Sequence, residues 1–115
     1  MEQRMTPTND NQSVRTYQIK GSQLIYWMPK ELDHHVAQAL CKELDWMVES
    51  YQIMELILDF ADTEFMDSSG IGVIIGRSKA MQFRGGMLYV SCLQERIESI
   101  FHAAGLHKIV KVKER

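Results

Sequence analysis

Two adjacent serines give this chain its most chemically suggestive segment, since residues 67–76 read Asp-Ser-Ser-Gly-Ile-Gly-Val-Ile-Ile-Gly. The segment follows a strongly apolar run and opens a helical pattern, so Ser68 and Ser69 fall near a helix N-terminus. In α/β proteins that position lies at the carboxyl edge of the sheet, where functional residues gather. Free N–H groups and the helix dipole favour an anion there by about 0.3–1 kcal/mol. The segment predicts a helix capped by Asp67 or Ser68, with a serine at an anion-favouring position.

Two enzymatic interpretations of the segment have little support. A hydrolase nucleophile elbow needs Gly-x-Ser-x-Gly, whereas Met66 stands where the first glycine belongs if Ser68 is the nucleophile. A dinucleotide fingerprint needs G-x-G-x-x-G, but the third glycine comes one position late in the series Gly70, Gly72, Gly76, and no Walker motif is present. We therefore predict no catalytic residue and no cofactor.

The glycines of the expected helix need another explanation, because glycine inside a helix costs about 1 kcal/mol relative to alanine. Gly72 and Gly76 share one face, and Ser69 lies three residues before Gly72. This small-residue strip either packs closely against a neighbouring helix or offers a surface that a partner's backbone can approach. The sequence leaves both possibilities open. A different sector of the helix is expected to face the sheet, formed by Ile71, Ile74, Ile75 and Ser78.

Histidines and cysteines form no metal-binding pattern. His34 and His35 are adjacent, so on a helix their side chains point about 100° apart and cannot chelate one ion together. Cys41 and Cys92 are too few for a disulfide framework. We predict no metal site.

The composition narrows the function classes. The 115 residues suit one domain, and a net charge of −2 lacks the basic excess of a nucleic-acid binder. No apolar stretch approaches the ~20 residues of a membrane span. The first residues lack a secretory signal pattern, so the cytoplasm is the expected compartment.

The elements that position residues 67–76 follow from alternating apolar patterns. Residues 1–13 are polar and predict a flexible tail ahead of a domain over 14–115. A helix is expected from the cap Asp33 to about Tyr51, and the other expected elements are a hairpin (14–19 and 23–28), strands 54–60, 87–92 and 108–112, and helices 68–83 and 94–104. This β-β-α-β-α-β-α-β order predicts an α/β fold. Its sheet is expected to be mixed, largely parallel and of four to five strands, packed with three or more helices.

Two segments resemble the anti-sigma-factor antagonists of the STAS domain family. Residues 65–77 are similar to the family's phosphorylation-site segment, and residues 31–35, Glu-Leu-Asp-His-His, are similar to a second signature of its sporulation-type members. Both stand in the expected element order, and the resemblance covers residues 14–112. Residues 14–115 are therefore expected to form a single STAS domain.

The resemblance implies a non-enzymatic protein that binds a serine-kinase anti-sigma factor and frees a sporulation sigma factor. The kinase would phosphorylate Ser68, the first serine after the aspartate, and a PP2C-type phosphatase would restore the binding-competent form. Phosphorylation adds about −1.5 to −2 charge beside Asp67 and near Asp33, enough to weaken binding a hundredfold without refolding. The expected partner-binding residues are Asp33, Asp67, Ser68, Ser69, Gly70 and Gly72.

The chain departs from the family pattern at a few places. Lys30 stands where the family usually has glycine, and no helix is expected after the last strand. We expect a monomer or weak dimer, without a membrane or direct nucleic-acid partner. The main alternative function is a scaffold or sensory domain of a stressosome-like assembly, which would form large particles.

Overall fold

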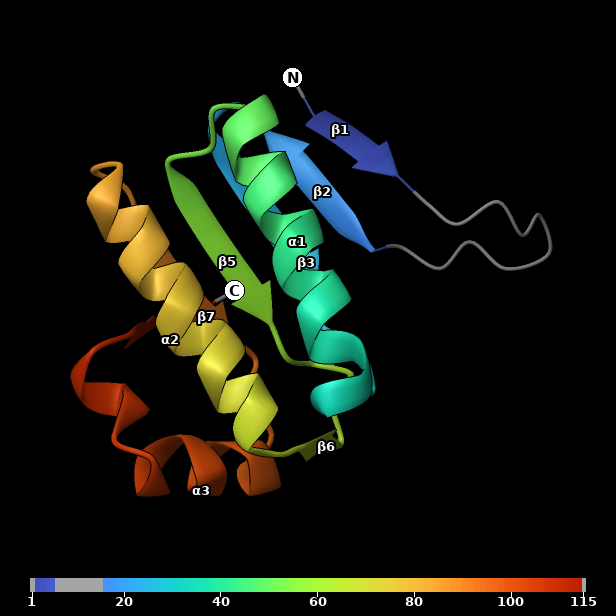
Figure 1. Ribbon diagram of the computed structural model, residues 1–115, viewed down its shortest axis with the longest axis vertical. Coiled ribbons are helices and arrows are strands. Elements are labelled where there is room, and N and C mark those ends of the chain that lie inside the picture. Colours follow the sequence, from blue (N-terminus) through green and yellow to red (C-terminus); the bar gives the residue numbers. More distant parts are fainter. Residues whose placement is uncertain (1, 6–15, 115) are drawn as a thin grey trace, which may run out of the picture.

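A mixed six-stranded sheet forms the centre of the molecule in the computed structural model, which describes residues 2–5 and 16–114 (Figure 1). The order along the sheet is β1-β2-β3-β5-β7-β8. The first three strands pair antiparallel, and β3 onward pair in parallel. The mixed, largely parallel sheet expected from the sequence is confirmed, but it has six strands rather than the four to five expected, because β1 adds a strand at the edge. The strands are β1 (Glu2–Met5), β2 (Tyr17–Lys20), β3 (Gln23–Trp27), β5 (Glu55–Asp59), β7 (Met87–Ser91) and β8 (Lys111–Val112).

Two long helices lie side by side over one face of the sheet, α1 (His34–Ser50) and α2 (Ser68–Phe83) (Figure 1). Successive parallel strands are laid down in one direction, so two right-handed crossovers place both helices on the same face. Arg77 Nε lies 3.0 Å from Asp45 Oδ1 and links the two helices. A third helix, α3 (Glu95–Ala103), runs past the end of the sheet where α2 begins (Figure 1).

The core lies between the sheet and these helices. Alternate strand residues point into it, and Leu24, Leu56 and Val90 are fully buried there. Ile57 is also buried but lies outside this cluster, on the opposite face of the sheet. On that face Lys113 Nζ sits 4.7 Å from the centre of the Tyr89 ring, so long side chains shield a surface that none of the described helices covers.

Strand β1 differs from the flexible tail expected over residues 1–13. Glu2–Met5 pairs antiparallel with β2, from Glu2 opposite Lys20 to Met5 opposite Tyr17. The outer edge of β2 offers unpaired backbone N–H and C=O groups, which a strand can bond without any apolar periodicity of its own. The remainder of the expected tail, residues 6–13, lies outside the described residues.

The last expected strand, over residues 108–112, is shorter than predicted. A 3-10 turn, η1 (Leu106–Lys108), follows Gly105, and β8 begins only at Lys111. Leu106 and Val110 are both buried. A spacing of four between buried residues fits a helical turn, whereas a strand would bury every second residue. Among the described residues, no helix combines the length and apolar character that crossing a bilayer requires.

Candidate functional site

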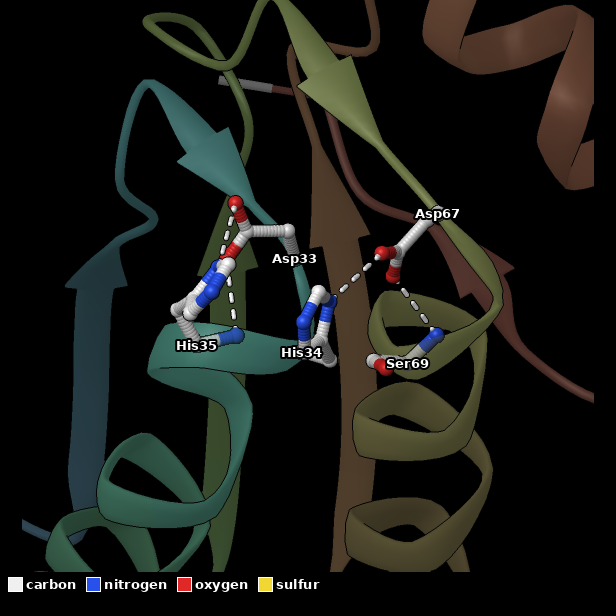
Figure 2. Close-up of polar contacts among 5 residues, drawn as sticks. All are labelled: Asp33, His34, His35, Asp67 and Ser69. Atoms are coloured by element: carbon white, nitrogen blue, oxygen red, sulfur yellow. Dashed lines mark hydrogen bonds and ion pairs between the residues drawn. The ribbon is translucent and has the colours of Figure 1, made fainter.

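A second, two-stranded parallel sheet holds the starts of α1 and α2 side by side. It pairs β4 (Glu31–Leu32) with β6 (Phe65–Met66). Each short strand runs directly into an aspartate, so Asp33 and Asp67 stand at neighbouring helix starts (Figure 2). No strand was predicted at either segment, because two residues are too few to show a strand periodicity.

Both aspartates cap the helices that they precede. Asp33 Oδ1 accepts a hydrogen bond from the backbone N–H of His35 at 2.9 Å, and Asp67 Oδ1 accepts one from Ser69 at 2.8 Å (Figure 2). A side-chain cap of this kind stabilises a helix by about 0.5–2 kcal/mol. The predicted cap at Asp33 is confirmed, and of the two candidates for the second helix Asp67 forms the cap.

His34 links the two capped helices. Its Nδ1 lies 3.7 Å from Asp67 Oδ2, so a residue at the start of α1 contacts the cap of α2 (Figure 2). The next ring, His35, turns instead to its own cap, with Nδ1 3.6 Å from Asp33 Oδ2. The two rings nevertheless lie close together, with centroids 4.0 Å apart and planes tilted by 36°, so the divergence expected of adjacent helical residues is not observed. Sequence reasoning also missed the contact between His34 and Asp67. The one indication in the sequence was that His34 directly follows the capping residue Asp33, which places it at the start of its helix.

The carboxyl group of Asp67 is held in its charged form. Partial loss of water raises the pKa of Asp67, but the hydrogen bonds from Ser69 and His34 outweigh it and lower the pKa below its usual range. Asp67 therefore carries its charge throughout the neutral range, directly beside Ser68.

Hydrogen bonds tie together the two loops that lead into β4 and β6. Thr63 is completely buried, and its hydroxyl donates to the carbonyl of Pro29 at 2.9 Å. The carbonyl of Lys30 accepts from the N–H of Glu64 at 2.8 Å. The Lys30 side chain points outward and forms an exposed ion pair with Glu64 at 3.9 Å. Exposed ion pairs of this kind contribute little to the stability of the fold. Lysine at this position therefore leaves the backbone contact between the loops in place.

Ser68 and the small-residue strip of α2 face outward. Ser68 and Gly72 are exposed, while Ser69 and Gly76 are partly covered. A Cβ atom added at Gly72 or Gly76 would meet no other atom within 4 Å. The strip therefore does not pack against a neighbouring helix of the described chain, which leaves the open-surface explanation.

Gly70, predicted to bind a partner, is buried instead. A Cβ atom there would lie 2.3 Å from Met66 Cγ and 3.0 Å from Leu32 Cδ2, so only glycine lets α2 fit under the β4–β6 pair. The buried face of α2 includes Val73, which was not predicted to be buried, whereas the predicted Ile71 and Ile75 are only partly covered. Gly70 is buried because the short β4–β6 pair covers the first turn of α2.

The arrangement presents an exposed hydroxyl on a rigid frame. Ser68 is the first residue of α2, where a new anion meets free backbone N–H groups and the positive end of the helix dipole. In the described part of the chain, no three His, Cys, Asp or Glu side chains gather as metal ligands. The site is suited to accepting a charged group on Ser68 without disturbing the helix.

Comparison with known proteins identifies the family to which this chain belongs. The sequence model of the STAS domain matches residues 13–115. The chain is 33% identical over 89 residues to the anti-sigma F factor antagonist of Paenibacillus polymyxa, covering 77% of this chain and 76% of that one. It is 32% identical over 85 residues to the anti-sigma-B factor antagonist of Bacillus subtilis (strain 168), covering 74% and 76%.

A solved structure agrees at the level of the fold. The anti-sigma factor antagonist SpoIIAA in its unphosphorylated form superposes with a TM-score of 0.74 at 21% identity, covering 84% of this chain and 83% of that one. Together with the match over residues 13–115, the shared architecture establishes that this chain belongs to the STAS domain family.

Proposed function

We propose that this protein is an anti-sigma factor antagonist, which binds a serine-kinase anti-sigma factor and is switched off when that kinase phosphorylates Ser68. The observation that carries the proposal is the exposure of Ser68 at the start of α2, directly after the Asp67 cap. Relatives about one-third identical over three quarters of the chain bear the name of anti-sigma factor antagonists. The protein acts in the cytoplasm, by binding rather than by catalysis.

The proposed contact surface extends from the two caps along α2. A kinase that reaches the Ser68 hydroxyl must also approach Asp33 and Asp67, because the β4–β6 pair holds both caps at the same end of the helices. Gly72 is exposed one turn further along and has no side chain to keep a partner's backbone away. The proposed surface comprises Asp33, Asp67, Ser68, Ser69 and Gly72, without the buried Gly70.

The proposed switch is electrostatic and steric rather than a change of fold. A phosphate on Ser68 adds about −1.5 to −2 charge. The N-terminus of α2 accommodates that charge within the protein. A docked partner meets the added bulk and a cluster of negative charge with Asp67 and Asp33, a mismatch that costs several kcal/mol. Binding weakens about a hundredfold or more, since each 1.4 kcal/mol is tenfold. A PP2C-type phosphatase reverses the switch.

The sporulation branch is the proposed pathway. Residues 31–35 are similar to the signature of sporulation-type members, and one relative acts on the anti-sigma F factor by name. Another relative is named for the anti-sigma-B factor. Binding assays against the sigma F-type and sigma B-type kinases of the source organism separate the two branches.

The deciding experiment is phosphorylation by the cognate kinase. The purified chain is incubated with ATP and the anti-sigma kinase, and the modified residue is mapped by mass spectrometry. We expect one phosphate, on Ser68, and no incorporation into Ser68→Ala. Ser69→Ala serves as the matched control and should be modified as the parent is. Phosphate on Ser69, with Ser68 unmodified, would contradict the proposal.

A further inference from the structure

Phe83, the last residue of α2, exposes 95% of its surface to solvent. The next most exposed large hydrophobic side chain in the described part of the chain is Trp46, at 62%, and its ring packs edge-on against Tyr51. A single exposed apolar residue is ordinary on a protein surface. Phe83 differs because of what lies beside it.

A groove of about 470 Å³ runs between α1 and α2 and has Phe83 on its rim. Val48 and Met81, both buried, form part of its lining, and Ala80 adds a small apolar wall. It lies toward the ends of the helices that are remote from Ser68 (Figure 1). One surface thus carries both a protruding aromatic ring and an apolar recess.

The same groove contains unpaired charges of both signs. Arg77 Nε and Asp45 Oδ1 form an ion pair at 3.0 Å. Arg84 lines the groove with its Nε buried and without a hydrogen-bond partner. Glu49 also lines it, and its carboxylate contacts no cation among the described residues. Among the described residues neither the Arg84 guanidinium nor the Glu49 carboxylate forms an ion pair, so each is available to an opposite charge on a second molecule.

We propose that two copies of this chain form a twofold-symmetric dimer through this groove. In such an interface each surface meets its own copy. Each Phe83 enters the apolar recess of the other copy, and each Arg84 faces Glu49 of the partner subunit. A second copy fits better than an unrelated protein because one surface supplies the ring, the recess and both unpaired charges. The dimer leaves Ser68, at the other end of α2, open to a kinase.

Analytical ultracentrifugation of the full chain over a wide concentration range tests the proposal. We expect a reversible monomer–dimer equilibrium, and Phe83→Ser should weaken the association at least about tenfold, as loss of a central aromatic anchor does. Ile109→Ser removes a side chain that is 51% exposed but lies outside the groove, and should leave the equilibrium unchanged.

A charge exchange tests the pairing itself. Arg84→Glu and Glu49→Arg should each weaken the dimer, and the double variant should restore it, because the twofold axis re-forms both pairs with reversed sign. Circular dichroism confirms that each variant is folded, so loss of association cannot be mistaken for unfolding. A chain that stays monomeric, forms large particles, or needs Phe83 only for binding the anti-sigma factor would overturn the proposal. Ser68→Asp should dimerise as the parent does, which keeps this test independent of the proposed switch.

Discussion

Asp67 connects three parts of the site at the scale of single residues. It caps α2 through the N–H of Ser69, contacts His34 of α1, and places a fixed negative charge beside Ser68. Alanine there would remove both the helix cap and the negative charge beside Ser68. The proposed switch at Ser68 therefore depends on the residue that precedes it.

Replacing Ser68 by aspartate is expected to weaken binding of the cognate anti-sigma factor about a hundredfold or more. The new carboxylate lies beside the Asp67 cap, where a docked partner meets it, while the helix start tolerates the charge. Titration calorimetry measures the affinity. Ser99→Asp adds the same charge at an exposed position of α3 and should bind as the parent does. Equal affinity for the two variants would count against a switch at Ser68.

Removing the imidazole of His34 is expected to raise the pKa of Asp67. The contact with His34 helps to hold that pKa below its ordinary value, together with the hydrogen bond from Ser69. His34→Gln should therefore shift the carboxyl titration upward in an NMR pH series. His35→Gln is the matched control, since His35 faces Asp33 instead. An unmoved titration in His34→Gln would show that this contact does not act on Asp67.

The sign of the pH effect follows from the direction of the shift. Because the folded pKa of Asp67 lies below its unfolded value, the charged carboxylate contributes stability above the unfolded pKa. That contribution is lost as the pH falls through the folded pKa. Chemical denaturation of the parent should show the loss in the acid range, and His34→Gln should show a smaller one.

The β4–β6 pair and the first turns of α2 are the elements that build the site. The pair fixes the two helix starts, and Gly70 lets α2 pass beneath it. Two glycines of the same helix, Gly70 and Gly72, thus have opposite roles. One is required by close packing, and the other leaves an open surface.

Alanine at these two glycines is expected to change stability in opposite directions. Gly70→Ala should destabilise the fold by about 1–3 kcal/mol, because its Cβ would overlap the side chain of Met66. Gly72→Ala should stabilise it by up to about 1 kcal/mol, since alanine favours helix and nothing lies near the added atom. Urea denaturation measures both. If Gly72 belongs to the contact surface, the stabilised variant should also bind its partner less tightly.

The elements that sequence patterns predicted are those with enough length to show a period. The helix over 34–50 carries periodic apolar residues behind a recognisable cap at Asp33, so its position could be read directly. The helix over 68–83 has almost no apolar periodicity, and its start was predicted from the capping residues at 67–68. The pairs Glu31–Leu32 and Phe65–Met66 are too short for any period, and β1 forms by backbone pairing at a free edge. Contacts such as that between His34 and Asp67 depend on which short strands meet, which one sequence does not reveal.

At the scale of the whole molecule, the net charge is so small that a single phosphate would change it substantially. The net charge is −2, so a phosphate on Ser68 roughly doubles it and concentrates the addition at one end of α2. The proposed dimer groove lies at the other end of the same helix. The two ends of α2 can therefore serve separate interactions.

The uncovered face of the sheet is held by a long-range ion pair. Lys113, after the last strand, contacts the Glu55 carboxylate of β5 and also lies over Tyr89 of the intervening strand β7. The hydrogen bond from Lys113 lowers the pKa of Glu55, with a smaller contribution from Gln23. This contact secures the short strand β8 to the centre of the sheet.

Removing the ion pair between Lys113 and Glu55 is expected to make the free energy of unfolding depend less on pH in the acid range. Because the folded pKa of Glu55 is depressed, its contribution is present above the unfolded pKa and is lost as the pH falls through the folded pKa. Lys113→Met should lower the free energy of unfolding at pH 7 and narrow the difference between pH 7 and acid. Urea denaturation at several pH values measures this. Lys111→Met, on β8 itself, is the control, and an equal response there would contradict a specific role for Lys113.

The β4–β6 pair also makes the geometry of the site independent of the loops that precede it. Two backbone strands, not the lengths of the preceding loops, set the spacing of the helix starts at Asp33 and Asp67. Loop insertions upstream of either short strand should therefore leave that spacing unchanged. Side chains such as His34 can then be replaced to suit a different partner, while the backbone around Ser68 stays the same.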